Sequence, residues 1–294
     1  MSGCARRSER RIRRAAAALG LWLGLSVAAA GPGGAEEAPQ RVVSINLCTD
    51  QLAMMLAAPG QLHSVTNLAA DPRVSAMAEE AAAYPLNRGR AEDIYLMRPD
   101  LVLAGRYTAR PTVAMLRRLG IPVVVFDPAL SLDEVRDRMV KMGAALGREE
   151  AAARAVADFD ARLAALREDV ARRPRAALYY ANGYTAGDRT LAGQILLAAG
   201  FENVAVSAGL AAGGRLPLEL LALSDPEALV TARPHPGASR AEEILDHPVV
   251  RALRRSRAAG AFTDRDWACG TPHVLGAVEE LAALRRALPE GRTE

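Results

Sequence analysis

The residues best suited to bind a ligand follow the predicted β-strands of this chain. Arg106 and Tyr107 come shortly after an apolar run at 101–103, and a guanidinium beside a phenol suits an oxygen-rich or anionic ligand. Because ligands of open α/β sheets bind beyond the carboxyl ends of the strands, these two residues are the first candidates. A plain surface arginine is the alternative for Arg106, since only its position in a turn favours ligand binding.

Other polar and aromatic residues follow predicted strands in the same way. One group comes after the run at 42–45 and another after the run at 176–180, while a tryptophan lies in a loop before the last predicted helix. For the aromatic members, ordinary loop packing is the alternative that stays open. The candidate ligand-binding residues are Asn46, Cys48, Thr49, Asp50, Arg106, Tyr107, Asn182, Tyr184 and Trp267.

Two glutamates occupy matching positions in the two halves of the chain. Glu92 lies seven residues before Pro99, and Glu219 lies seven residues before Pro226. Each proline ends a short predicted helix and precedes a buried strand. The helix dipole stabilises a glutamate in a first turn, which explains either residue alone. The same spacing in both halves favours a paired role.

Two other classes of function fit the residues less well. A metal-ion binder needs several histidine and carboxylate ligands that converge, whereas the four histidines are scattered along the chain. An envelope hydrolase needs a nucleophile beside a base, and the sequence has no Gly-x-Ser-x-Gly elbow, phosphate loop or dinucleotide glycine motif. We therefore expect no catalytic residues and no resident metal or cofactor.

These residues must be positioned by an α/β fold. Short apolar runs alternate with helical segments from residue 41 to 146 and again from 174 to 288, which predicts mostly parallel sheets covered on both sides. Between the halves, residues 148–173 contain neither glycine nor proline, and their larger apolar residues fall on one helical face. We therefore predict two matching α/β halves joined by one long helix.

Capping residues mark the start of two helices in the first half. Thr49 or Asp50 is expected to cap a helix that runs through Ala57. Ser131 is expected to cap another helix, with Glu134 three residues later completing a capping box.

Residues 1–35 have the layout of a cleaved secretory signal peptide. Six arginines precede an apolar run at 15–30, which is shorter than the ~20 residues of a membrane-spanning helix. Cleavage after Ala30 and after Ala35 both fit, and Sec and twin-arginine export both stay open. An uncleaved anchor is the alternative. No lipidation cysteine follows the run, because Cys4 precedes it, so we expect a freely diffusing periplasmic protein.

Removal of this segment changes the charge balance. The whole chain has 37 basic and 34 acidic residues, and residues 36–294 have 31 and 33. The basic excess therefore belongs to the signal, and nothing after it argues for a nucleic-acid partner. Cys48 and Cys269 are the cysteines that remain, and whether they form a disulfide stays open.

Five segments together match one known family. They are the residues at 41–44 and 48–51, the stretch from Glu92 through Pro99 to Leu103, the helix at 148–173, and the stretch from Pro217 to Pro226. These segments resemble the periplasmic substrate-binding proteins of iron-siderophore and cobalamin ABC importers, of the class III type with a helical linker. The resemblance covers essentially the whole chain after the signal.

This resemblance implies two Rossmann-like lobes, at 40–147 and 174–290, joined by a rigid linker helix at 148–173 with a ligand between them. It also implies that Glu92 and Glu219 dock onto arginines of an ABC permease, since charge pairs fix the register of a broad, weak interface. The chain has only 4% aromatic residues, and Arg106 adjoins Tyr107, so a hydroxamate-like ferric siderophore is the expected ligand. Cobalamin or another corrinoid is the alternative, and haem stays open. We expect a monomer.

Overall fold

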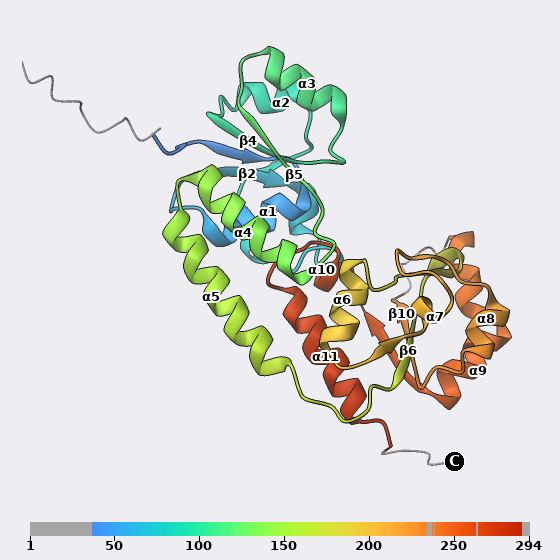
Figure 1. Ribbon diagram of the computed structural model, residues 1–294. Helices are drawn as coiled ribbons and strands as arrows, with labels where there is room; N and C mark the ends of the chain where they lie inside the picture. Colours follow the sequence, from blue (N-terminus) through green and yellow to red (C-terminus); the bar gives the residue numbers. More distant parts are fainter. Residues whose placement is uncertain (1–36, 234–236, 238, 263, 290–294) are drawn as a thin grey trace, which may run out of the picture. The chain divides into compact units, whose positions relative to one another are not determined.

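Figure 1 shows the computed structural model of the chain, which describes residues 37–233, 237, 239–262 and 264–289. The predicted signal peptide at 1–35 lies outside the described residues. Within the described part of the chain, no helix is both long enough and apolar enough to cross a membrane.

The first half of the chain folds around a five-stranded sheet. Its strands are β1 (Val42–Ser44), β2 (Leu62–Thr66), β3 (Leu86–Asn87), β4 (Leu101–Gly105) and β5 (Val123–Phe126). Its helices are α1 (Leu47–Leu56), α2 (Ala91–Leu96), α3 (Arg110–Arg118) and α4 (Leu132–Leu146), with 3₁₀ turns η1 (Asn67–Ala70) and η2 (Glu80–Ala83). The order is β3-β2-β1-β4-β5, and all neighbours are parallel. β4 is buried along its whole length, as expected for a strand covered on both faces.

The second half folds around a four-stranded sheet. Its strands are β6 (Arg175–Tyr179), β8 (Glu202–Asn203), β10 (Ala228–Ala232) and β11 (Ala258–Phe262), and a separate antiparallel pair is β7 (Tyr184–Thr185) with β9 (Gly214–Arg215). Its helices are α6 (Leu191–Ala198), α7 (Val204–Ser207), α8 (Leu218–Leu223), α9 (Pro248–Ser256), α10 (Asp264–Trp267) and α11 (Val274–Arg286), with 3₁₀ turns η3 (Ala181–Gly183) and η4 (Arg240–Asp246). The order is β11-β10-β6-β8, again with parallel neighbours.

The two sheets repeat one topology. In each, the first strand is flanked on one side by the next strand of the main sheet and on the other by a later strand, which gives β2-β1-β4-β5 and β8-β6-β10-β11. β10 is therefore the counterpart of β4. The fold class predicted from the alternating strand and helix signals, two Rossmann-like α/β lobes, is confirmed.

The helix between the sheets, α5 (Glu149–Leu166), is shorter than predicted. The helix predicted at 148–173 ends at Leu166, where Arg167 is extended, and the chain continues without regular secondary structure to residue 174. In this continuation Glu168 pairs with Arg285 and Arg286 of α11. The segment thus departs from its intrinsic helix propensity at the place where it contacts a distant element.

A single apolar cluster contains residues of both halves. α5 packs against both α4 and α11, and Phe159 and Leu163 of α5 are fully buried or nearly so. α4 also contacts α6. The cluster includes Leu103, Phe126, Met139, Phe159, Leu178 and Leu275. The linker helix is thus part of the core and not a bare connection.

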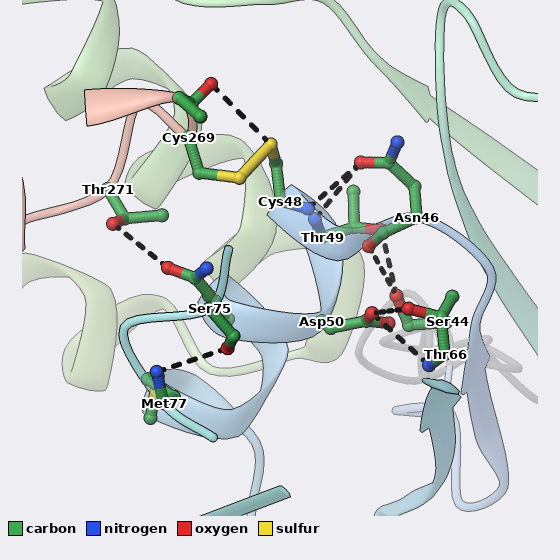
Figure 2. The surroundings of a disulfide bond; sticks show 12 residues. Ser44, Asn46, Cys48, Thr49, Asp50, Thr66, Ser75, Met77, Cys269 and Thr271 are labelled. Atoms are coloured by element: carbon green, nitrogen blue, oxygen red, sulfur yellow. Dashed lines mark hydrogen bonds between the residues drawn. A yellow bond between two sulfur atoms is a disulfide. The ribbon is translucent and has the colours of Figure 1, made fainter. Parts of the chain in front are cut away.

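Cys48 and Cys269 form a disulfide that joins the two halves (Figure 2). Cys48 lies in α1, and Cys269 lies between α10 and α11, with their Cα atoms 5.0 Å apart. This separation is ordinary for a disulfide. The bond answers the question that the sequence left open, and it fastens the start of α1 to the segment before the last helix.

This cross-link predicts a measurable loss of stability on removal. The two cysteines are 221 residues apart in sequence, so the bond restricts the unfolded chain strongly. Replacing both by serine should lower the free energy of unfolding by about 2–5 kcal/mol, measured by urea denaturation. Dithiothreitol should lower the midpoint of the wild type and leave that of the double variant unchanged. Equal midpoints for wild type and variant without reductant would contradict a formed bond.

Candidate functional site

Asn46 caps α1 at the carboxyl end of β1. Its side-chain oxygen accepts hydrogen bonds from the backbone N–H groups of Cys48, at 3.1 Å, and Thr49, at 3.4 Å. A Cβ added to Gly105 would lie 2.8 Å from Asn46, so this side chain also abuts the end of β4. The cap is therefore Asn46, and the prediction of Thr49 or Asp50 as the cap is wrong. The ends of β1 and β4 meet here, at the point where the strand order reverses.

The three residues predicted beside Asn46 are engaged within the protein. Cys48 is held in the disulfide, and Thr49 and Asp50 are fully buried. The Thr49 hydroxyl is 2.8 Å from that of Ser44, and Asp50 accepts hydrogen bonds from the backbone N–H and hydroxyl of Thr66, at 3.2 and 2.5 Å (Figure 2). Thr49 and Asp50 are therefore not accessible to a ligand, and the prediction that they contact one is wrong. Because α1 begins at Leu47, its first turn directs both side chains toward β1 and β2.

Burial changes the acidity of Asp50. Its removal from water raises the pKa from 3.8 to about 6, and hydrogen bonds from Ser44 and Thr66 offset only part of this effect. The carboxylate of Asp50 thus links α1 to β1 and β2, although its removal from water is unfavourable.

Arg106 and Tyr107 line a cavity of about 520 Å³ beyond the carboxyl ends of β4 and β5. Both side chains are exposed, Tyr107 by 83%. Arg106 forms an ion pair with Asp127, which follows β5, and the hydrogen bond from Arg106 holds the pKa of Asp127 below its usual range. The cavity has the volume of a small-molecule pocket, so these two predicted residues adjoin a space that a ligand can fill.

The cavity is also lined by residues that the sequence analysis did not select. Phe126 ends β5, and α4 contributes Arg138 and Lys141. The Lys141 ammonium lies 4.9 Å from the centre of the Phe126 ring and donates a hydrogen bond to the carbonyl of Val125, at 2.7 Å. The sequence did contain a sign that Arg138 is unusual, because it is a charged residue on an otherwise apolar helix face. The apolar residues of that face are Leu132, Val135, Met139, Met142 and Leu146.

The second-half candidates have different environments. Asn182 and Tyr184 follow β6 and are exposed. Trp267 is only 9% exposed, and its ring meets that of Tyr180 edge-on with 5.9 Å between the centroids. Packing, the alternative left open for the aromatic residues, therefore describes Trp267 better than direct ligand contact does.

The paired glutamates lie in equivalent places. Glu92 is exposed in the first turn of α2, which precedes β4, and Glu219 is exposed in the first turn of α8, which precedes β10. Four residues after each glutamate comes an exposed leucine. These are Leu96, 77% exposed, and Leu223, 79% exposed. Each half thus presents a carboxylate and an apolar side chain from a matching short helix.

The turn after each short helix is also repeated in backbone detail. Arg98, before Pro99, has φ = 50°, and Asp225, before Pro226, has φ = 39°. Positive φ is uncommon for residues other than glycine, and within the described residues Asn182 is the one other instance. The match between the halves therefore extends from the spacing of Glu and Pro to the conformation of the turn between them.

The wall of the cavity carries guanidinium, ammonium and phenol groups, which can donate hydrogen bonds to oxygen-rich or anionic groups. Among the residues that the structure describes, no group of three or more His, Cys, Asp or Glu side chains could hold a metal ion.

Sequence comparison relates the chain to one family. A family model described as periplasmic binding protein matches residues 42–257. The cobalamin-binding protein of Halobacterium salinarum is 31% identical over 199 residues, which cover 66% of this chain and 54% of that protein. The chain therefore spans about half the length of the curated relatives it matches.

Solved structures share the fold at low sequence identity. The periplasmic heme-binding protein RhuT from Roseiflexus sp. RS-1 has a TM-score of 0.67 at 23% identity, over 83% of this chain and 97% of that one. An ABC-type Fe3+-hydroxamate transport system structure from Saccharomonospora viridis DSM 43017 has a TM-score of 0.63 at 22% identity, over 85% and 94%. At these identities the likeness shows the fold alone.

The raised pKa of Asp50 predicts a pH dependence of stability. The folded state holds this proton up to about pH 6, whereas the unfolded chain releases it near 3.8. The free energy of unfolding should therefore fall as the pH rises from about 4 to about 6, by roughly 3 kcal/mol for this group. Asp50→Asn should remove this contribution, which denaturant titrations across the pH range can measure.

The control for this prediction is Asp137→Asn, which changes an exposed carboxyl. The control should keep the wild-type difference between pH 4 and pH 6. If Asp50→Asn and the wild type change in parallel with pH, the raised pKa is not present in the folded protein.

Proposed function

The chain belongs to the periplasmic binding protein family, and we propose that it captures a hydroxamate-like ferric siderophore and delivers it to an ABC import permease. The family consists of substrate-binding proteins, so the proposed role is binding and release without turnover. Residues 1–35 would direct export, and the protein would act as a monomer in the periplasm.

One observation carries the choice of ligand. Arg106 and Tyr107 lie together on the wall of the cavity of about 520 Å³. The shell of a ferric hydroxamate consists of oxygen atoms, which accept hydrogen bonds from a guanidinium fork and a phenol. The same wall presents Lys141 over Phe126, which adds a further donor beside an apolar surface. A cavity with a few convergent donors and an apolar floor supports recognition of a compact chelate.

A second candidate ligand, cobalamin, is favoured by a different observation. The relative from Halobacterium salinarum that is 31% identical is named a cobalamin-binding protein. A corrinoid is larger than a hydroxamate chelate, so it would extend beyond the cavity of about 520 Å³ and need contacts outside it.

We propose that the partner, a permease, is contacted through Glu92 and Glu219. Two separated carboxylates fix the orientation of a broad interface and increase the rate of encounter with a basic partner. Leu96 and Leu223 extend the same surface, because each is largely exposed four residues after its glutamate. Exposed leucines at matching places fit apolar contacts that form after the charges have oriented the two proteins.

Binding is tested most simply through Trp267, the one tryptophan after residue 35. Titration with a ferric hydroxamate should quench its fluorescence at micromolar or lower concentration, and Arg106→Gln should weaken binding by about tenfold or more. Arg162→Gln, which changes an exposed arginine of α5, is the matched control. Parallel titrations use cyanocobalamin and haem. Tight binding of cyanocobalamin alone would replace the siderophore by the second candidate, and no binding of any of the three would contradict the function.

Docking is tested by Glu92→Ala together with Glu219→Ala. Ligand affinity should be unchanged, because neither residue lines the cavity, whereas uptake into vesicles that contain the cognate permease should fall by about tenfold or more. The control replaces Glu80 and Glu243, one exposed glutamate from each half, and should leave uptake intact. Normal uptake by the Glu92/Glu219 variant would refute docking through these residues.

A further inference from the structure

Arg138 is a buried arginine on the wall of the cavity beyond β4 and β5. It lies in α4 among residues that pack into the core, and only 8% of its surface is exposed. Within the described residues its side chain has no hydrogen bond and no ion pair, and its Nε is buried without a partner. A charged group in such a position needs an explanation.

The neighbouring backbone restricts where this guanidinium can go. A Cβ added to Gly270 would lie 3.1 Å from Nη1 of Arg138 and 2.3 Å from the Cβ of Ala129. The chain at Gly270, directly after the disulfide-bonded Cys269, therefore passes close to the arginine with no room for a side chain. A guanidinium confined in this way loses little further freedom when a ligand binds.

The formal charges around the cavity balance, but its charged groups differ in whether they already have partners. Three basic and three acidic residues line the cavity. Asp137 is exposed, and as the sequence neighbour of Arg138 on a helix it does not face it. The lining groups that have partners are Arg106 with Asp127, Glu134 with the backbone N–H of Leu130, and Lys141 with the carbonyl of Val125. Among the described lining residues, Arg138 is thus the cation that lacks an acceptor.

A carboxylate is the acceptor that best fits this group. Burial lowers the pKa of Arg138 to about 10, although the attraction of Asp127 opposes this effect, so the side chain is still charged at neutral pH. A buried guanidinium without a partner is unfavourable, and a carboxylate matches its planar fork with two parallel hydrogen bonds. We propose that Arg138 binds a carboxylate of the ligand, and that the chelate carried by this protein bears at least one free carboxylate.

This inference rests on the proposed function and narrows it. The oxygen atoms of a neutral hydroxamate chelate can accept hydrogen bonds from Arg106 and Tyr107. Such a chelate has no anionic group to pair with Arg138. A chelate with the same core and carboxylate substituents can accept hydrogen bonds from Arg106 and Tyr107 and also pair with Arg138. The two cases differ in one chemical group, so matched ligands separate them.

The test compares ligand pairs that differ in their carboxylates, by calorimetry on the mature protein. The pairs are ferrichrome and ferrichrome A, haem dimethyl ester and haem, and cyanocobalamin and its monocarboxylic acid derivative. In at least one pair the carboxylate-bearing member should bind the wild type about ten- to a hundredfold more tightly. Arg138→Gln should abolish this preference, so that the two members of the pair bind the variant with affinities within about threefold of each other.

Two further variants make the result specific. Arg138→Lys keeps the charge without the fork and should retain a reduced preference, which also covers the case in which Arg138→Gln does not fold. Arg162→Gln removes an exposed arginine of α5 and should keep the full preference. Equal affinity of the wild type for both members of every pair that binds, or a preference that survives in Arg138→Gln, would overturn the inference alone. Failure of the wild type to bind any of the six compounds would overturn the proposed function itself, and this inference with it.

Discussion

Parallel pairing of the strands is the constraint on which the rest of this protein depends. A parallel strand cannot be followed by a tight hairpin, so each strand leads into a crossover and all strands of a sheet end at one edge. In the first half this edge brings together Asn46 after β1, Arg106 after β4 and Asp127 after β5. The cavity lies beyond the ends of β4 and β5. The site is therefore a consequence of topology, and its chemistry is decided by the few residues placed at the strand ends.

The start of α1 shows how this edge is made rigid. Asn46 caps the helix, Cys48 links it to Cys269, and Asp50 fastens it to Thr66 on β2. The buried carboxylate is unfavourable in solvation terms, as its raised pKa shows, but its hydrogen bonds fix the register of helix and strand. With α5 packed against both α4 and α11, the two halves share a core and a covalent bond, which favours a binding site that changes little in shape.

Much of the fold could be predicted from the sequence, because strand runs such as 101–103 and 123–126 are apolar without interruption. The repeated spacing of Glu and Pro also correctly predicted that α2 and α8 are equivalent, since they precede corresponding strands of the two sheets. Helix propensity did not predict the end of the linker helix, which was expected at 148–173 and ends at Leu166. Just after this point Glu168 contacts α11, which lies far away in the sequence. The residues of the site were harder to predict, because the direction of a side chain depends on where its helix begins. A start at Leu47 buried Thr49 and Asp50, and the turn of α4 that places Arg138 at the cavity follows from packing rather than from a motif.

The proposed function requires a metal chelate to be held beyond the carboxyl ends of β4 and β5. The position of the metal is its most direct test, and anomalous diffraction at the iron edge from crystals of the protein with a bound ferric hydroxamate would give it. We expect one iron peak in the cavity, with ligand oxygens within hydrogen-bonding distance of Arg106 and Tyr107. A peak elsewhere, such as in the hollow of about 500 Å³ beside α6 and Glu168, would contradict it.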